Sequence, residues 1–111
     1  MIELAWAAGF FDGEGTTGIQ KPKSANLVIK IQIGQNDPET LYRFNSAIRH
    51  LGRIYGPYAN KSGTERHTLI VYGYEGVQAV IAMLWNFLSP PKREQAAHAL
   101  LKFRASINPK I

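Results

Sequence analysis

Residues 7–15, AAGFFDGEG, combine small residues, aromatic residues and two acids near the start of a 111-residue chain. Ala5, Gly9 and Gly13 recur every four residues, which places them on one face of a helix. A stripe of such small residues lets another backbone approach closely, as at small-residue helix crossings in membranes. An alanine-rich helix packed under a sheet would show the same pattern, so the stripe alone leaves both interpretations open. We expect this helix over residues 2–12, ended by the glycines that follow.

Strand and helix patterns alternate along the rest of the chain. Strict period-two alternation over residues 26–35 predicts a half-buried strand, with Ile29, Ile31 and Ile33 facing inward. The first expected hairpin consists of strands 16–21 and 26–35, and a helix that starts at Asp37 and is closed by Gly52 follows it. The second expected hairpin consists of strands 53–58 and 66–72. A helix over 77–88, with Trp85 and Phe87 as core aromatic residues, is followed by a break at Ser89-Pro90-Pro91 and a last helix over 92–105. The order αββαββα(α) predicts an α+β fold, with a four-stranded antiparallel sheet and helices on one face.

The charge of the chain is unevenly placed. There are 13 Lys and Arg against 8 Asp and Glu, a net charge of +5. Residues 1–14 hold three of the acids and no base, so all the bases lie in the remainder. Long basic stretches without acids are typical of proteins that bind a polyanion, although a solvated basic surface gives the same count.

The composition excludes several classes of protein. A hydrophobic fraction of 45% is enough for a packed core, and we expect residues 1–111 to form one domain. The absence of cysteine excludes disulfide scaffolds, thiolate zinc sites and cysteine nucleophiles. The longest uncharged run, residues 76–91, is shorter than the roughly 20 residues of a membrane helix. No basic residue opens the chain, so we expect no secretory signal.

The outward face of the expected sheet carries polar and basic side chains of the types found in nucleic-acid interfaces. Arg, Lys, Gln and Asn reach base edges and phosphates, and the only acid in either hairpin is Glu65, near a turn. We therefore expect a nucleic acid as the partner and no membrane. The candidate DNA-binding residues are Gln20, Lys21, Lys23, Asn26, Val28, Lys30, Gln32, Arg53, Tyr55, Tyr58, Asn60, Lys61, Arg66, Thr68, Ile70 and Arg93.

Glu14 breaks a local rule. An anion after the last turn of a helix is disfavoured by the helix dipole, and such exceptions point to function. A carboxylate at this position is a hard oxygen ligand suited to Mg²⁺, although acids in turns are also common. Residues 13–18 match the glycine pattern of dinucleotide-binding loops, but Pro22 prevents the helix that must follow, so we expect no small-molecule cofactor.

Residues 7–15 resemble the signature of the LAGLIDADG homing endonucleases. Ala7 stands where the family usually has Leu, and Glu14 stands where the family name has Asp. The resemblance implies a homodimer in which the first helices of two chains pack together, at an interface formed by Ala5, Ala8, Gly9 and Asp12. It also implies a saddle-shaped sheet that lies in the DNA major groove.

The same resemblance implies a reaction and its residues. Glu14, Gln35 and Lys92 are the expected catalytic residues, and the Glu14 carboxylate and the Gly13 carbonyl are the expected ligands of Mg²⁺ or another divalent cation. The expected function is an intron-encoded, site-specific double-stranded DNA endonuclease that hydrolyses phosphodiesters at a long pseudo-palindromic site. The alternative is a LAGLIDADG-type protein that binds nucleic acid without cleaving it, such as an intron maturase or a DNA-binding regulator.

Overall fold

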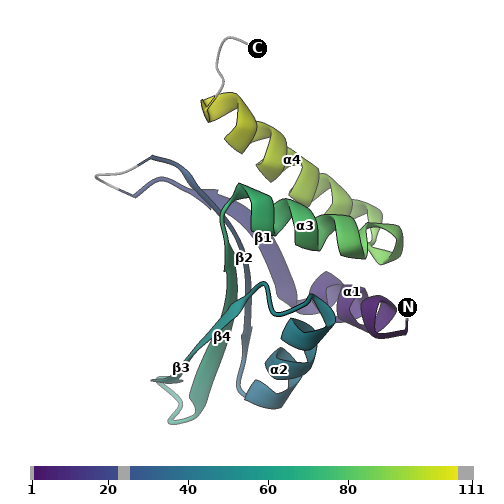
Figure 1. Ribbon diagram of the computed structural model, residues 1–111. Coiled ribbons are helices and arrows are strands. Elements are labelled where there is room, and N and C mark those ends of the chain that lie inside the picture. Colours follow the sequence, from purple (N-terminus) through teal and green to yellow (C-terminus); the bar gives the residue numbers. More distant parts are fainter. Residues whose placement is uncertain (1, 23–25, 108–111) are drawn as a thin grey trace.

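The protein is described by a computed structural model that covers residues 2–22 and 26–107 (Figure 1). The elements are α1 (Ile2–Glu14), β1 (Gly15–Gln20), β2 (Val28–Gln35), α2 (Pro38–Ala47), β3 (Arg53–Ala59), β4 (Glu65–Tyr72), α3 (Tyr74–Leu84), the 3₁₀ helix η1 (Trp85–Phe87) and α4 (Pro90–Ile107). The predicted order of helices and strands is confirmed.

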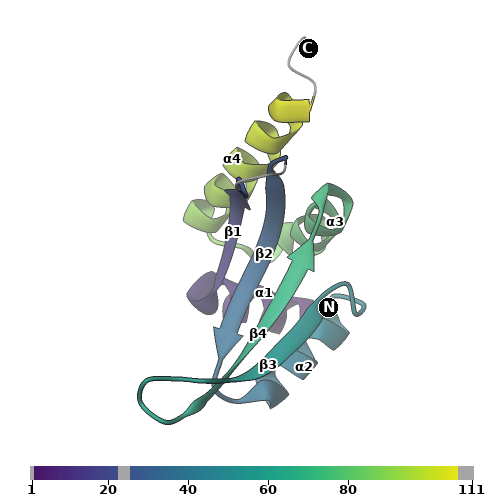
Figure 2. The same ribbon diagram turned by 90° about the vertical axis from the view of Figure 1, so that its left-hand side faces the viewer.

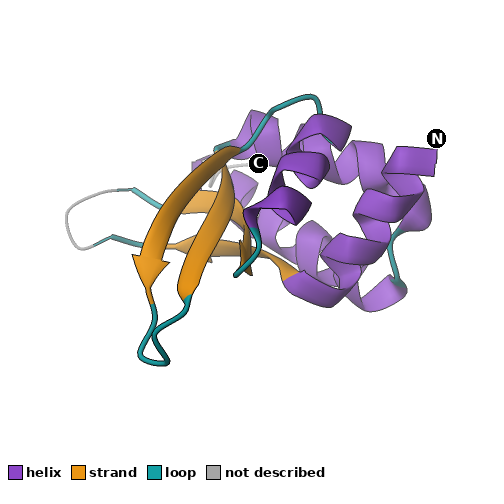
Figure 3. Cartoon of the chain, turned by 90° about the horizontal axis from the view of Figure 1, so that it is seen from below, coloured by secondary structure: helices purple, strands orange, loops and turns teal. Residues whose placement is uncertain are grey.

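The strands form one antiparallel sheet in the order β1-β2-β4-β3. The sheet is strongly curved and all the helices lie against one face of it, so that its other face is uncovered (Figures 1 and 2). Seen from below, strands and helices separate into two layers (Figure 3). The pairing of β3 with β4 shifts register between Tyr55 and Tyr58, at a cis peptide bond between Gly56 and Pro57 that the sequence did not predict.

The hydrophobic core lies between the sheet and the helices. Ile29, Ile31 and Ile33 of β2 are fully buried, as their period-two spacing predicts. Phe11 of α1 and Phe44 of α2 meet beneath them with ring centroids 6.3 Å apart. Because Phe11 anchors α1 in this core, the end of α1 is held at one end of the sheet.

The ends of the first two helices differ from the predictions. Helix α1 continues through Gly13, and Glu14 is its last residue, whereas the sequence predicted that Glu14 comes after the helix has ended. Helix α2 begins as expected, with the Asp37 carboxylate accepting a hydrogen bond from the Glu39 amide at 3.0 Å. It ends at Ala47, however, and the turn is made by Arg49 and His50 with positive φ angles of 60° and 59°, so Gly52 does not close it.

Two further corrections concern the C-terminal half. Pro90 and Pro91 begin α4 instead of preceding it, because a proline in the first turn of a helix needs no hydrogen-bond partner for its nitrogen. Trp85 and Phe87 are 37% and 38% exposed, so they are not core residues. No helix among the described residues is long and apolar enough to cross a membrane.

Candidate active site and nucleic-acid interface

Glu14 stands at the junction between α1 and β1. Its side chain is exposed, and within residues 2–22 and 26–107 it forms no ion pair. The next residue, Gly15, is buried against the Phe11 ring, where a Cβ atom would lie 2.9 Å from Phe11 Cγ. Only glycine fits this close approach, so the chain turns directly from helix into strand and leaves the Glu14 carboxylate at the surface.

Lys92 lies beside this junction although it is distant in sequence. It belongs to the first turn of α4, and its Nζ donates a hydrogen bond to the carbonyl oxygen of Gly15. The same Nζ lies 5.8 Å from the centroid of the Phe11 ring. The structure therefore places a cationic side chain next to the residue that follows Glu14.

Gln35 is the last residue of β2 and reaches the same end of the sheet. Gly15 pairs with Ile33, so β2 extends two residues beyond the start of β1, and Gln35 pairs with His67 on the other side. The side chain of Gln35 is half-buried. The three predicted catalytic residues thus come from α1, β2 and α4 and gather around one end of the β1–β2 pair.

The residues present suit a hard divalent cation only in part. Glu14 offers an exposed carboxylate, and the carbonyl of Gly13 belongs to the last turn of α1, where carbonyls lack helical partners. Oxygen donors of this kind are those that Mg²⁺ prefers. However, no group of three or more His, Cys, Asp or Glu residues suited to hold a metal occurs in the part of the chain that the structure describes.

One face of α1 is open. Ala5 and Gly9 are exposed, and a Cβ atom at Gly9 or Gly13 would meet nothing within 4 Å. Ala8 lies away from this face, fully buried in the core. The carboxylate of Asp12 is also engaged inside the chain, so the open face is narrower than the sequence predicted.

Asp12 binds the start of α4. Its two carboxylate oxygens each lie 3.2 Å from the Ser89 amide nitrogen, and Oδ1 accepts a further hydrogen bond from the Ser89 hydroxyl at 3.1 Å. The carboxylate oxygens of Asp12 therefore face Ser89 of the same chain and not a second chain. This corrects the prediction that the Asp12 side chain belongs to the interface between chains.

The uncovered face of the sheet is basic and polar. Pairing places Lys30, Gln32, Arg53, Tyr55 and Arg66 on this face, together with Gln20, Val28, Tyr58, Thr68 and Ile70. None of the outward positions paired along the described strands is acidic. This face is broad and concave, and it faces the viewer in Figure 2.

Comparison with known structures identifies this arrangement. The homing endonuclease I-CvuI, in complex with the I-CreI target, matches with a TM-score of 0.75 and 20% identity, over 98% of this chain and 70% of that chain. The LAGLIDADG meganuclease I-AabMI, bound to uncleaved DNA, matches with a TM-score of 0.74 and 19% identity, over 97% of this chain and 38% of that chain. This chain has the LAGLIDADG homing endonuclease fold.

A further match extends the LAGLIDADG comparison. The group I intron-encoded homing endonuclease I-CeuI, complexed with DNA, gives a TM-score of 0.72 at 17% identity, over 96% of this chain and 56% of that chain. At the level of sequence, no protein-family model matches the chain. No curated protein matches it either. The fold resemblance stated from residues 7–15 is thus confirmed by structure alone.

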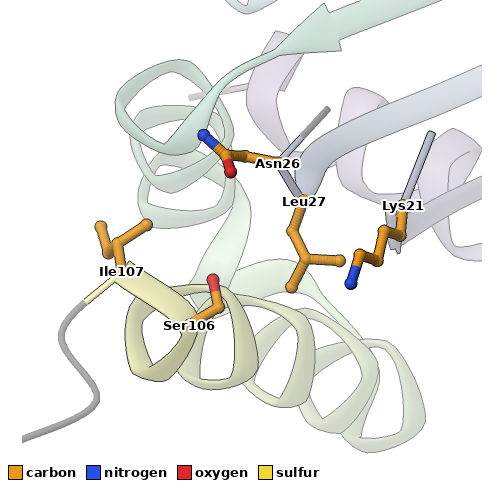
Figure 4. Close-up of a pocket in the computed structure, with 5 residues that line it drawn as sticks. All are labelled: Lys21, Asn26, Leu27, Ser106 and Ile107. Carbon is orange, nitrogen blue, oxygen red and sulfur yellow. The ribbon is translucent and has the colours of Figure 1, made fainter. Parts of the chain in front are cut away.

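Some predicted DNA-binding residues lie off the LAGLIDADG sheet face. Lys21 and Asn26 line a pocket of about 420 Å³ between the β1–β2 hairpin and the end of α4, which Ser106 and Ile107 also line (Figure 4). Asn60 and Lys61 belong to the turn between β3 and β4. Arg93 lies on the helical side, with its Nε donating to the Trp85 carbonyl at 2.9 Å. Lys23 is outside the described residues.

Sequence reasoning missed two outward residues of the LAGLIDADG sheet as DNA candidates. Tyr72 pairs with Lys30, and Thr16 pairs with Gln32, so both lie on the uncovered face. The period-two alternation of the strands could have identified both residues, because Thr16 and Tyr72 each lie two residues from an outward-facing position of the same strand.

Proposed function

We propose that the chain is one subunit of a homodimeric, site-specific double-stranded DNA endonuclease that uses Mg²⁺ or another divalent cation. The observation that carries the proposal is the position of Glu14: an exposed carboxylate at the end of the open face of α1, with Lys92 bound to the adjacent Gly15 carbonyl. The fold likeness supports the same function, because I-CvuI, I-CeuI and I-AabMI are endonucleases complexed with DNA.

A second copy of the chain completes the acidic site. Within the described residues of one copy, no three ligating side chains surround Glu14, whereas cleavage of two strands by paired metals needs acids from two sides. Ala5, Gly9 and Gly13 let a second α1 approach closely along the open face, and this would bring the two Glu14 residues together at its end. One chain also corresponds to only 38% of I-AabMI, so a pair of chains approaches the size of that enzyme.

Each proposed catalytic residue has a chemical role. Glu14 and the Gly13 carbonyl would hold the divalent cation, which, when bound, would supply an activated water and stabilise the leaving 3′ oxygen. Lys92 stabilises the charge that develops on the phosphate, and Gln35 positions the attacking water through its amide. Structures of I-CvuI with DNA in the presence of Mg and of Ca support a divalent cation in such a site.

The uncovered sheet face binds the DNA. Its Arg, Lys, Gln and Tyr side chains alternate along strands that fit the major groove, and Lys or Arg contacts with phosphates give affinity while Gln and Arg contacts with bases give specificity. A homodimer presents two such faces, so the target is pseudo-palindromic.

Selection of cleaved sites from a randomised duplex pool with Mg²⁺ tests the function. We expect one pseudo-palindromic site to be enriched by the wild-type protein and by Glu75→Gln, an exposed acid of α3 that serves as the control. Glu14→Gln should bind the selected site with unchanged affinity and cut it at least 100-fold more slowly. Specific binding without cleavage by the wild type would instead support the non-cleaving alternative. Equal cleavage by Glu14→Gln would remove Glu14 from the reaction.

A further inference from the structure

Three contacts fasten the start of α4 to the α1–β1 junction. The Asp12 carboxylate accepts hydrogen bonds from the Ser89 amide and hydroxyl, the Gly15 carbonyl accepts one from Lys92, and the Gln95 side chain accepts one from the Thr17 amide at 3.2 Å. These contacts are called the α4 clamp below. They join segments 77 and 78 residues apart in sequence, so no local preference creates them.

Within the α4 clamp, the Asp12 carboxylate lies at the N-terminal end of α4, where the helix dipole favours a negative charge. Ser89 directly precedes α4, and its carbonyl accepts the Arg93 amide at 3.0 Å, so it caps the first turn. Pro90 and Pro91 have no amide N–H, so the Ser89 amide is the donor that the Asp12 carboxylate binds at this end of α4, where the positive end of the helix dipole lies. A carboxylate placed there fixes both the axial position and the rotation of the turn that carries Lys92.

We propose that Asp12 is a positioning residue that acts through Ser89 on Lys92, and not a residue of the interface between copies. The inference rests on the proposed function of Lys92 in phosphodiester cleavage. Without the carboxylate, Ser89 loses three close acceptor contacts, and the first turn of α4 moves relative to the Gly15 carbonyl. A displacement of about 1 Å at a catalytic group can reduce a rate about 100-fold.

The first test measures the position of Lys92 without using cleavage. Competitive acetylation followed by mass spectrometry reports the reactivity of each lysine, and exposed Lys102 in the same helix serves as the internal reference. We expect Asp12→Ala to raise the reactivity of Lys92 several-fold relative to Lys102, because its bond to Gly15 is lost. Asp12→Asn keeps an acceptor for Ser89 and should retain near wild-type reactivity. An unchanged Lys92 in Asp12→Ala overturns the proposal.

The second test measures single-turnover cleavage and coupling. Asp12→Ala should slow cleavage about 10- to 100-fold with unchanged DNA affinity, and it should cause no further loss when Lys92 is already replaced by Met. A loss that multiplies with that of Lys92→Met would show that Asp12 does not act through Lys92. Glu94→Gln, an exposed acid in the same turn, is the control and should cleave normally.

Two outcomes separate this inference from its alternatives. Sedimentation of Asp12→Ala should match the wild type, and a change in association state would assign Asp12 to the interface and overturn the proposal. If Asp12→Ala does not fold, Ser89→Ala replaces it, because this variant removes only the hydroxyl contact. It should raise the reactivity of Lys92 and slow cleavage in the same way, but by smaller factors. If the wild type cuts no DNA, the proposed nuclease function fails, whereas the acetylation result still decides whether Asp12 positions Lys92.

Discussion

The guanidinium of Arg66 lies over Gly34 on the uncovered face of the sheet. A Cβ atom at Gly34 would stand 2.6 Å from Arg66 Cζ, so the absence of a side chain in β2 creates the space that the arginine of β4 occupies. The Arg66 guanidinium therefore lies against β2 near the end of that strand, on the face that we propose binds DNA.

Gly34→Ala should displace Arg66 and weaken DNA binding. The clash involves the end of a flexible side chain, so the free energy of unfolding should change by less than about 1 kcal/mol. Affinity for the selected duplex should fall by about 10-fold, because a lost bidentate arginine contact costs about 1–3 kcal/mol. The control is Gly18→Ala on the same face of β1, where an added Cβ meets nothing within 4 Å. Equal affinities for the two variants, measured by fluorescence anisotropy without divalent cation, would contradict this role of Arg66.

Gly9→Leu should dissociate the proposed dimer. Gly9 lies on the open face of α1, where an added Cβ atom meets nothing within 4 Å, and a leucine side chain there would keep two helices apart. Gly9→Ala is the matched control, since it keeps the residue small and should stabilise the helix by about 0.5–1 kcal/mol. Sedimentation equilibrium at micromolar protein concentration measures the association state of both variants. A wild-type monomer, or a Gly9→Leu dimer, would count against the interface on α1.

The sheet was predictable from sequence because its signals are local. Ile29, Ile31 and Ile33 alternate with polar residues, and a period of two specifies which side chains are buried before any tertiary contact is known. The same alternation predicted the basic outward face. Glu14 was also identifiable, because its position at a helix end conflicts with the helix dipole.

The arrangement around α4 was not predictable in the same way. The resemblance to the LAGLIDADG family implied an interface role for Asp12, but its carboxylate is satisfied by Ser89, which is 77 residues away. Arg93 was assigned to DNA from its charge, but its guanidinium lies over the Trp85 ring, 5.3 Å from the centroid. Both outcomes depend on tertiary neighbours, which residue type and spacing do not specify.

DNA affinity should depend steeply on salt through the sheet face. Each neutralised phosphate contributes about −0.9 to the slope of log K against log salt concentration. Lys30→Gln removes one cation from the outward face of β2 and should make the slope shallower by about 1. Lys102→Gln makes the same charge change on the opposite, helical side and should leave the slope unaltered. Titrations from 50 to 200 mM salt, a range of about four-fold, compare the two; equal slopes would show that Lys30 contacts no phosphate.

Acid should weaken the contact between α1 and α2. The Arg43 guanidinium donates to both Glu3 oxygens, at 2.7 and 3.1 Å, and lies 3.8 Å from the centroid of the Trp6 ring. These hydrogen bonds lower the pKa of Glu3 below its ordinary value of 4.5. Because the folded pKa is depressed, the stabilisation is present above pH 4.5 and is lost as the pH falls through the lower folded value.

Glu3→Gln should therefore remove part of the acid sensitivity of the fold. At pH 7 the variant should melt slightly below the wild type, since the exposed ion pair contributes little, and the difference should shrink as the pH falls below 4.5 and Glu3 is progressively protonated. Thermal unfolding followed by circular dichroism between pH 3 and pH 7 measures this, with Glu75→Gln as a control that lacks the arginine partner. A difference between wild type and Glu3→Gln that persists undiminished at pH 3 would mean that packing of the Glu3 side chain, and not its charge, supports the α1–α2 contact.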